Sequence, residues 1–496
     1  MFPRLNPHWK SRAFLLTLLW GTGCDKAGED DIDLKLNGGS QTSNFPNIGS
    51  IAVSGSEDLT FRGTGTAVDV TPLFAEELPL FRERHVVLTG AHVSWRYEEE
   101  PVQTTSLRFV PGPHPYERRE SAAQEICYVF EHPGYFPDVD VKDRHYLSVD
   151  TPYDLAVVVL KDALAEDIQP AALPGELASP CDQGGAPCDL MVVANGTRQD
   201  DRSIGFTYWD KVAGLEVRSS TPPLLRGRMP ASAGIAGGDS GSALMPLHRN
   251  AVLGINVAID PDSSARNNAF FSVALDEGRV DWIKGALSSI QNPLLFRYRC
   301  HPSLPFLQRL IDKGVVGEIE VLVESPATET TANHPVLLEW LVRAFGKSIE
   351  EWEALYNDTP ARDRPEIFRL AQMLVKGLQL PLENYVYPQG HARAGQTDAE
   401  LLIQQVFGST MFRDFPEEVR RNIAIAVDQH LLPTDGVGAD IRTPTGGLKL
   451  GEAMVLIYQG MVAVGKAEAF TSRGILHTDA AMLPAGSAYL VYRPNR

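Results

Sequence analysis

Hydrophobic and polar residues alternate in two different ways along this chain, and the change falls near residue 291. From Ile48 to about Ile290, short apolar runs are separated by Gly, Pro, Asp and Asn, which favour turns. Such runs occur at 50–53, 85–93, 155–160, 191–196, 251–259 and 269–275. Many short strands with turn signals between them predict an antiparallel β barrel or sandwich. This part closes with a predicted helix over 278–290, in which Val280, Ile283 and Leu287 share one face.

Beyond Gln291 the hydrophobic positions recur at helical spacing. Helices are predicted over 303–314, 334–346, 365–377, 398–408, 417–430 and 448–460, and several end on Gly, the residue preferred for a left-handed C-cap. We therefore place a domain boundary at 291–302 and a helical domain over 303–462. The last stretch, 463–496, contains short apolar runs such as 488–492 and is expected to add strands.

Three blocks of the helical part, 307–346, 369–408 and 423–460, share one order: a helix, an apolar turn, an irregular stretch and a second helix. This order resembles S-layer homology repeats, and the resemblance implies that the domain binds a cell-envelope polymer. The threonine-arginine start of the second helix in that family is absent here. The alternative is a helical domain that packs on the β-rich part.

The first residues predict export. A basic start is followed by the apolar run 13–20 and by small residues at 21–23, which together indicate a signal peptide over 1–23. Small residues directly before Cys24 resemble a bacterial lipoprotein signal, so we expect lipid attachment at Cys24 and a lipid-anchored position in the bacterial cell envelope. That signal usually has Leu three residues before the cysteine, where this chain has Gly. Simple secretion and an uncleaved apolar start are the alternatives.

Composition and net charge limit the classes of partner that this chain can bind. Hydrophobic residues make up 43% and charged residues 22% of the chain, which are values of a globular protein. The net charge is −18, from 63 acidic and 45 basic residues, and this charge repels phosphate backbones and disfavours nucleic-acid binding. After residue 23, no stretch approaches the ~18 apolar residues that a membrane span needs.

The five cysteines suit an oxidising compartment, because four remain if Cys24 carries lipid. Cys181 and Cys188 flank a turn-rich loop and are expected to form a disulfide. Cys127 and Cys300 are then left as the residual pair. A zinc site is the alternative, but no CxxC spacing supports it. We predict no metal and no cofactor.

The segment 237–244, GGDSGSAL, is the strongest chemical motif. Ser240 lies on a predicted tight turn between Gly238 and Gly241, which have no Cβ, so a substrate carbonyl can approach closely. The amides of Gly238 and Ser240 could then stabilise a developing oxyanion. Taken alone, such a motif is also typical of a surface turn.

Two further residues change the interpretation of this serine. His92 ends a small-residue turn after a predicted strand, and Asp154 directly precedes the apolar run 155–160. Each alone is typical of a structural role. A serine hydroxyl needs a base to become a nucleophile, and the base needs a carboxylate that fixes its tautomer. Together, His92 and Asp154 could fill these two roles for Ser240.

With these three motifs, residues from about Leu36 to Ile290 resemble the trypsin-like (chymotrypsin-fold) serine peptidases. TGAHV, YDLAVV and GGDSGSAL resemble the family's histidine, aspartate and serine motifs. The resemblance implies two six-stranded β barrels over residues 36–291, with the triad between them. The expected fold is therefore multidomain, with an all-β chymotrypsin-like double barrel followed by a mainly α C-terminal domain.

By this resemblance the protein is a serine endopeptidase that acts on a protein or peptide substrate through an acyl-enzyme. His92 is the general base, Asp154 orients it, and Ser240 attacks the scissile carbonyl. Gly238 and Ser240 form the oxyanion hole. The alternative is a catalytically idle domain of the same fold, used for binding or adhesion at the cell envelope.

The resemblance also suggests the substrate preference. Members that cleave after Arg or Lys place an acid six residues before the serine, where this chain has Gly234. The aligned neighbours Val257 and Ala269 are uncharged as well. A buried cation would have no partner there, so we expect a non-basic P1 residue.

Activation follows the same comparison. Zymogens of the family are cut before an apolar residue, whose new ammonium pairs with the Asp beside the serine. Lys35-Leu36 resembles that site, with Asp239 as the buried partner and 24–35 as a propeptide. The alternative is a flexible linker with a chance lysine.

Overall fold

The computed structural model describes residues 40–470 except for 43–44, 55–58, 75–83, 95–106, 113–122, 136–150, 175–188, 196–206, 219–222, 231–234, 236–237, 248, 261–268, 292–299, 301–302, 318–332, 360–365, 382–415, 430, 432–447 and 449. The predicted helix over 398–408 and the predicted strands of 471–496 lie outside these residues. Residues 463–470 contain no strand.

The first sheet closes into a barrel. Its strands are β2 (Ile48–Ser54), β3 (Leu59–Asp69), β4 (Val86–Thr89), β5 (Leu107–Val110), β6 (Gln124–Glu131), β7 (Ala156–Leu160) and β8 (Ala171–Ala172). The order is β2-β5-β6-β7-β4-β3-β8, and the additional antiparallel pairing of β2 with β3 closes a ring of six strands. The β4 and β7 side chains are buried throughout, which explains their continuous apolar sequence.

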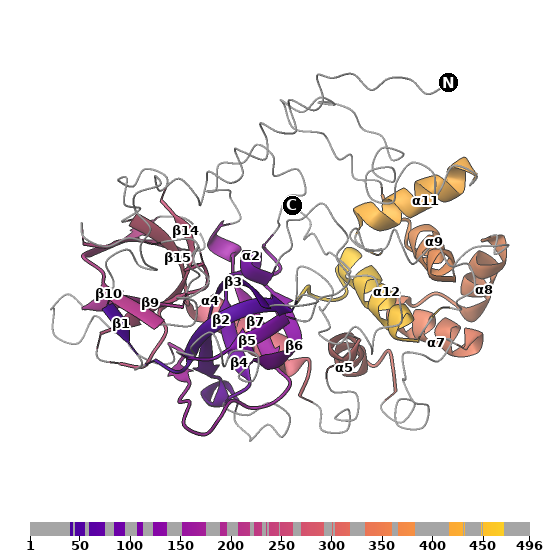
Figure 1. Ribbon diagram of the computed structural model, residues 1–496. Helices are drawn as coiled ribbons and strands as arrows, with labels where there is room; N and C mark the ends of the chain where they lie inside the picture. Colours follow the sequence, from indigo (N-terminus) through magenta and orange to yellow (C-terminus); the bar gives the residue numbers. More distant parts are fainter. Residues whose placement is uncertain are drawn as a thin grey trace, which may run out of the picture.

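The second sheet has eight strands and forms the other barrel (Figure 1). Its strands are β1 (Ser40–Thr42), β9 (Leu190–Ala194), β10 (Thr207–Lys211), β11 (Gly214–Arg218), β12 (Leu224–Arg228), β13 (Ala243–Pro246), β14 (Gly254–Ile259) and β15 (Ala269–Ala274). Their order is β1-β10-β9-β13-β14-β15-β12-β11. The predicted apolar runs coincide with β2, β4, β7, β9, β14 and β15, and the chymotrypsin-like double barrel is confirmed. The expected six strands are found in the ring of the first barrel, whereas the second sheet has eight described strands.

Short helices lie between strands of the first barrel, and α4 (Glu277–Ser288) follows the last strand of the second barrel. The others are η1 (Thr71–Leu73), α2 (Ala91–Ser94) and η4 (Thr151–Tyr153). Asp276 caps α4, because its side chain accepts the amide hydrogen of Arg279 at 3.0 Å. The buried face of α4 differs from the predicted one at one position: Arg279 is buried and Val280 is half-buried.

A mainly helical region follows, as predicted (Figure 1, orange to yellow). Its helices are α5 (Leu304–Asp312), α7 (His334–Phe345), α8 (Ile349–Asp358), α9 (Glu366–Leu378), α11 (Glu417–Asp428) and α12 (Leu450–Ala463). None of the described helices is long and apolar enough to cross a membrane.

The predicted glycine C-caps are confirmed at two helices and wrong at two others. Gly314 and Gly346 follow α5 and α7 with φ of +69° and +81°. Gly377 lies inside α9, where a Cβ would meet the ring of Trp352 at 2.5 Å. Gly460 lies inside α12, with the ring of Phe345 at 3.1 Å from such a Cβ. These two glycines allow close helix packing instead of ending a helix.

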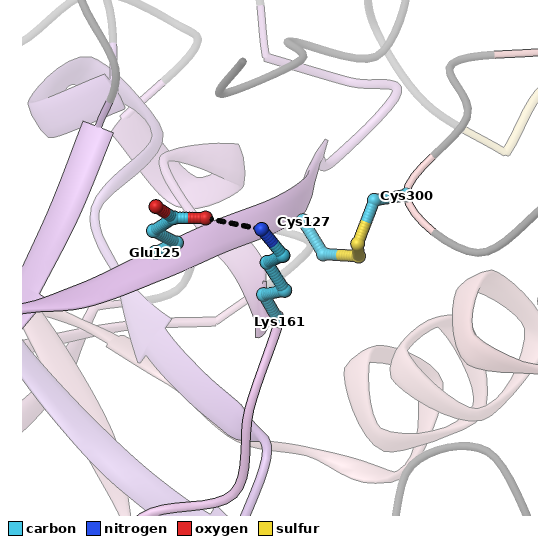
Figure 2. The surroundings of a disulfide bond; sticks show 4 residues. All are labelled: Glu125, Cys127, Lys161 and Cys300. Carbon is cyan, nitrogen blue, oxygen red and sulfur yellow. Dashed lines mark hydrogen bonds and ion pairs between the residues drawn. A yellow bond between two sulfur atoms is a disulfide. The ribbon is translucent and has the colours of Figure 1, made fainter. Parts of the chain in front are cut away.

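The barrels and the helical region share one hydrophobic core. A continuous cluster of buried side chains includes Val157 of the first barrel, Val273 of the second and Leu310 of α5. A disulfide between Cys127 on β6 and Cys300, just before α5, adds a covalent link across 173 residues (Figure 2). The residual cysteine pair of the sequence is therefore bonded.

Candidate active site

His92 and Asp154 make a direct contact between α2 and the segment before β7. His92 Nδ1 lies 2.6 Å from one carboxylate oxygen of Asp154, and the His92 amide donates to the other at 2.9 Å. Asp154 is 6% exposed. One buried carboxylate therefore fixes both the backbone and the ring of His92.

This contact sets the tautomer and the basicity of His92. An ionised carboxylate only accepts, so Nδ1 carries the proton and the neutral ring leaves Nε2 as an acceptor. Burial lowers the pKa of His92, but the charge and the hydrogen bond of Asp154 raise it more, so the net pKa lies above 6.5. The ring is thus a better base than an isolated imidazole.

The segment 238–241 forms a tight turn whose backbone requires glycine. Gly238 and Gly241 both have φ of +86°, a region that side chains with a Cβ rarely adopt. The Gly241 amide donates to the carbonyl of Asn256 at 2.7 Å, and the Ser242 amide donates to that of Asp239 at 2.9 Å. Within the described part of the chain, no such hydrogen bond is found for the amides of Gly238 and Ser240.

The first barrel holds this turn through Thr64 of β3. The Thr64 amide donates to the Ser240 carbonyl at 2.7 Å, and the Thr64 hydroxyl donates to the Gly238 carbonyl at 3.0 Å. A Cβ on neighbouring Gly63 would lie 2.7 Å from the Ser240 carbonyl oxygen and 2.8 Å from the side chain of Val93. Ser240 and the residue after His92 therefore lie against the same point of β3.

Buried polar side chains that the sequence analysis did not single out support the turn from the second barrel. Asn256 donates to the Ser242 hydroxyl at 2.6 Å and accepts a hydrogen bond from Ser272. The backbone amide of Asn195 donates to the Thr64 hydroxyl at 3.1 Å. A lone Asn or Thr in a strand gives no sequence signal, because its partners come from distant strands.

The predicted substrate pocket is described in part. Val257 lies at the bulge of β14 and is 5% exposed, and Ala269 at the start of β15 is 3% exposed. The carbonyl of Ala269 accepts the amide hydrogen of Asp260 at 2.9 Å. Asp260 is buried, and its carboxylate is already paired with the guanidinium of Arg226 on β12.

A second histidine lies behind Asp154, and its environment keeps it neutral. His132 stacks on Tyr153 with ring centroids 5.1 Å apart, and its Nδ1 accepts the Gly134 amide hydrogen at 3.0 Å. Burial and the nearby Arg279 lower the pKa of His132 to about 4. It is therefore a neutral packing residue at neutral pH.

Several predicted site residues lie outside the described residues: Cys24, Leu36, Cys181, Cys188 and Gly234. Asp239, the predicted partner of the new N-terminus, is described and fully buried. Among the residues that the structure describes, no His, Cys, Asp or Glu cluster could hold a metal ion.

Comparison with known proteins gives one family match. Residues 80–283 match the family model named Trypsin. Curated proteins give no match. Solved structures that align with this chain include human heparin binding protein, at 19% identity and a TM-score of 0.34, over 50% of this chain and 96% of that one. Another is the protease Anisep from Arthrobacter nicotinovorans, at 11% identity and a TM-score of 0.30, over 47% and 92%. Mouse neuropsin aligns at 16% identity and a TM-score of 0.33, over 49% and 96%.

Proposed function

Since residues 80–283 match the family model named Trypsin, we propose that the protein is a trypsin-like serine endopeptidase that uses Ser240, His92 and Asp154. The observation that carries the proposal is the 2.6 Å contact between His92 Nδ1 and Asp154. A histidine held in this way has its Nε2 available as a base, and the serine turn is bonded to β3 beside the same helix.

In the proposed reaction, His92 Nε2 takes the hydroxyl proton of Ser240 while the serine oxygen bonds to the scissile carbonyl carbon. The negative oxygen of this intermediate is stabilised by the amides of Gly238 and Ser240. The protonated His92 then gives its proton to the leaving amine, which leaves an acyl-enzyme. A water molecule, deprotonated by His92, then attacks the acyl carbon. The bond from this carbon to the Ser240 oxygen breaks, His92 returns the proton to Ser240, and the acid product is released.

We propose a non-basic residue at P1. The support is the uncharged character of Gly234, Val257 and Ala269, and the pairing of the buried Asp260 with Arg226. A basic side chain in such a pocket would have to be desolvated without a counter-charge.

Processing and location form a further part of the proposal. Export by residues 1–23 and attachment through Cys24 would deliver the uncut chain to the cell envelope, where the helical region would contact an envelope polymer. Cleavage before Leu36 would then separate the active enzyme from the lipid on Cys24. Burial of Asp239 agrees with a role as partner of a new N-terminus. Membrane fractionation of Cys24→Ser and N-terminal sequencing of the active species test these steps.

The deciding experiment is labelling by a fluorophosphonate probe together with hydrolysis of a peptide library. We expect labelling of the wild type and none of Ser240→Ala, which should lose several orders of magnitude in turnover. Ser288→Ala, at an exposed serine of α4, is the matched control and should label normally. A folded wild type that neither labels nor hydrolyses would instead favour the idle binding domain.

A further inference from the structure

Helix α4 holds the segment that contains Asp154 through a buried arginine. Arg279 is 2% exposed, and its guanidinium donates to the carbonyls of Pro152 at 2.6 Å and Ala274 at 2.8 Å. The same group pairs with Asp276 at 3.3 Å. A buried guanidinium must keep its acceptors, so the backbone two residues before Asp154 follows the position of α4.

An aromatic stack makes a second connection between this segment and α4. Tyr153 stacks on His132, and His132 contacts the ring of Trp282 with centroids 4.9 Å apart. A Cβ on Gly134 would lie 2.6 Å from the Tyr153 ring, so the stack has no spare room on that side. The His132 amide also donates to the carbonyl of Leu155 at 2.9 Å. Tyr153 and Leu155, the two neighbours of Asp154, therefore both contact His132, which in turn contacts Trp282 of α4.

The helical region contacts α4 at the opposite end of this stack. The indole N–H of Trp282 donates to the carbonyl of Phe470 at 3.1 Å. One turn further along α4, the Gly285 carbonyl accepts a hydrogen bond from Arg309 of α5 at 2.8 Å. The guanidinium of Arg309 lies 4.4 Å from the centroid of the Phe470 ring. Helix α5 and the segment that follows α12 therefore both contact α4.

Phe470 is the centre of this junction. Its ring is 4% exposed and contacts Phe306 of α5 at 5.1 Å, Tyr458 of α12 at 5.6 Å and Phe130 of β6 at 6.2 Å between centroids. The Cys127–Cys300 disulfide leaves β6 three residues from Phe130 and joins it to the segment before α5 (Figure 2). Such a close-packed, covalently tied junction transmits displacement instead of absorbing it.

We propose that the helical region is a positioning element of the active site, which holds the Asp154 carboxylate against His92 through Phe470, Trp282 and Arg279. For its effect on turnover this rests on the proposed peptidase function. The geometric part concerns the His92–Asp154 contact alone. Phe470 and Trp282 are positioning residues, since neither touches the reacting groups.

The test uses the full chain with Phe470→Ala and the milder Trp282→Phe, which keeps an aromatic ring but loses the donor to the Phe470 carbonyl. Phe345→Ala is the matched control, because its ring packs on Trp352 of α8 within the helical region. Three quantities are measured: kcat and KM for a peptide, the acid limb of the pH profile, and the proton NMR resonance of His92 Nδ1–H. A short hydrogen bond to Asp154 shifts that resonance far downfield.

We expect Phe470→Ala to lower kcat about tenfold to a hundredfold with KM changed less than about twofold, as loss of catalytic alignment does. Its acid limb should move to lower pH and its downfield resonance should weaken or move upfield. Trp282→Phe should show the same changes to a smaller degree, and it decides the matter if Phe470→Ala does not fold. Phe345→Ala should keep all three properties even if its unfolding midpoint falls.

Two results would overturn the inference, and one separates it from the proposed function. Normal kcat, acid limb and resonance in both junction variants, or equal losses in Phe345→Ala, would show that the helical region only adds stability. A wild type with the downfield resonance but without hydrolysis or probe labelling would refute the peptidase function. In that case the resonance alone still decides whether the junction positions Asp154.

Discussion

Replacing Gly241 by Ala tests whether the serine turn is held against the first barrel. A Cβ at this position would lie 2.0 Å from the Thr64 carbonyl oxygen and 2.3 Å from the Thr89 hydroxyl oxygen. Real Cβ contacts essentially never fall under 3.0 Å, so the turn and β3 would have to separate by about 1 Å. The backbone there also has φ of +86°.

The cost can be worked from these contacts. The left-handed conformation costs a residue with a Cβ about 1–2 kcal/mol. Separation weakens two hydrogen bonds between β3 and the turn, from the Thr64 amide to the Ser240 carbonyl and from the Thr64 hydroxyl to the Gly238 carbonyl, at about 1 kcal/mol each. The variant should lose about 3–4 kcal/mol of stability, and a displacement of this size should reduce the probe-labelling rate about a hundredfold.

Two other glycines serve as controls, because Gly346 lacks the contact cost and Gly285 lacks both costs. Gly346 has φ of +81° but nothing within 4 Å of a Cβ, so Gly346→Ala should cost about 1–2 kcal/mol and keep full labelling. Gly285 lies inside α4, also with open space, so Gly285→Ala should gain about 0.5–1 kcal/mol. The assays are urea unfolding and the rate of labelling by a fluorophosphonate. If Gly241→Ala matched Gly346→Ala in both assays, the argument that Thr64 pins the turn would be refuted.

Three further outcomes follow from the charges of the site. The kcat/KM of the wild type should fall as the pH drops through the His92 pKa, which lies above 6.5, because only neutral His92 accepts a proton. Asp154→Asn should move this acid limb to lower pH and reduce kcat about 10⁴-fold. His132 has a pKa of about 4 when folded and about 6.5 when unfolded, so the unfolded state binds more protons between these values and stability should decrease as the pH is lowered through this range. Urea unfolding at pH 7 and pH 4.5 should show a loss of about 2–2.5 kcal/mol in wild type and none in His132→Phe. Asp260→Asn should lower the free energy of unfolding by about 3–5 kcal/mol, because it leaves Arg226 without its buried partner. Changing both residues to Leu should recover most of this loss, as the midpoint of urea unfolding would show.

The sequence predicts the barrel part well because strand signals and chemical motifs are both local there. The run 155–160 predicts β7, and Asp154 directly before it marks the strand end that faces His92. Helix α8 was not predicted, although Ser348 and Glu351 form a capping box that signals its start. The sequence predicts Gly377 as a helix end, because its role in packing depends on Trp352, which comes from another helix.

The supports of the site are harder to predict because each depends on partners far away in the sequence. Thr64 meets the Gly238 carbonyl across 174 residues, and Arg279 meets the Pro152 carbonyl across 127. A buried arginine on a predicted apolar helix face contradicts the hydrophobic pattern, and its acceptors become visible only when strands and loops are assembled. Such exceptions cluster around Asp154 and the serine turn, the two places where the proposed chemistry requires groups to be held in one geometry. A polar residue that breaks a hydrophobic pattern beside a catalytic motif is therefore a useful sign of a positioning role. Arg279 meets both conditions, because it breaks the apolar face of α4 and its acceptor lies two residues before Asp154.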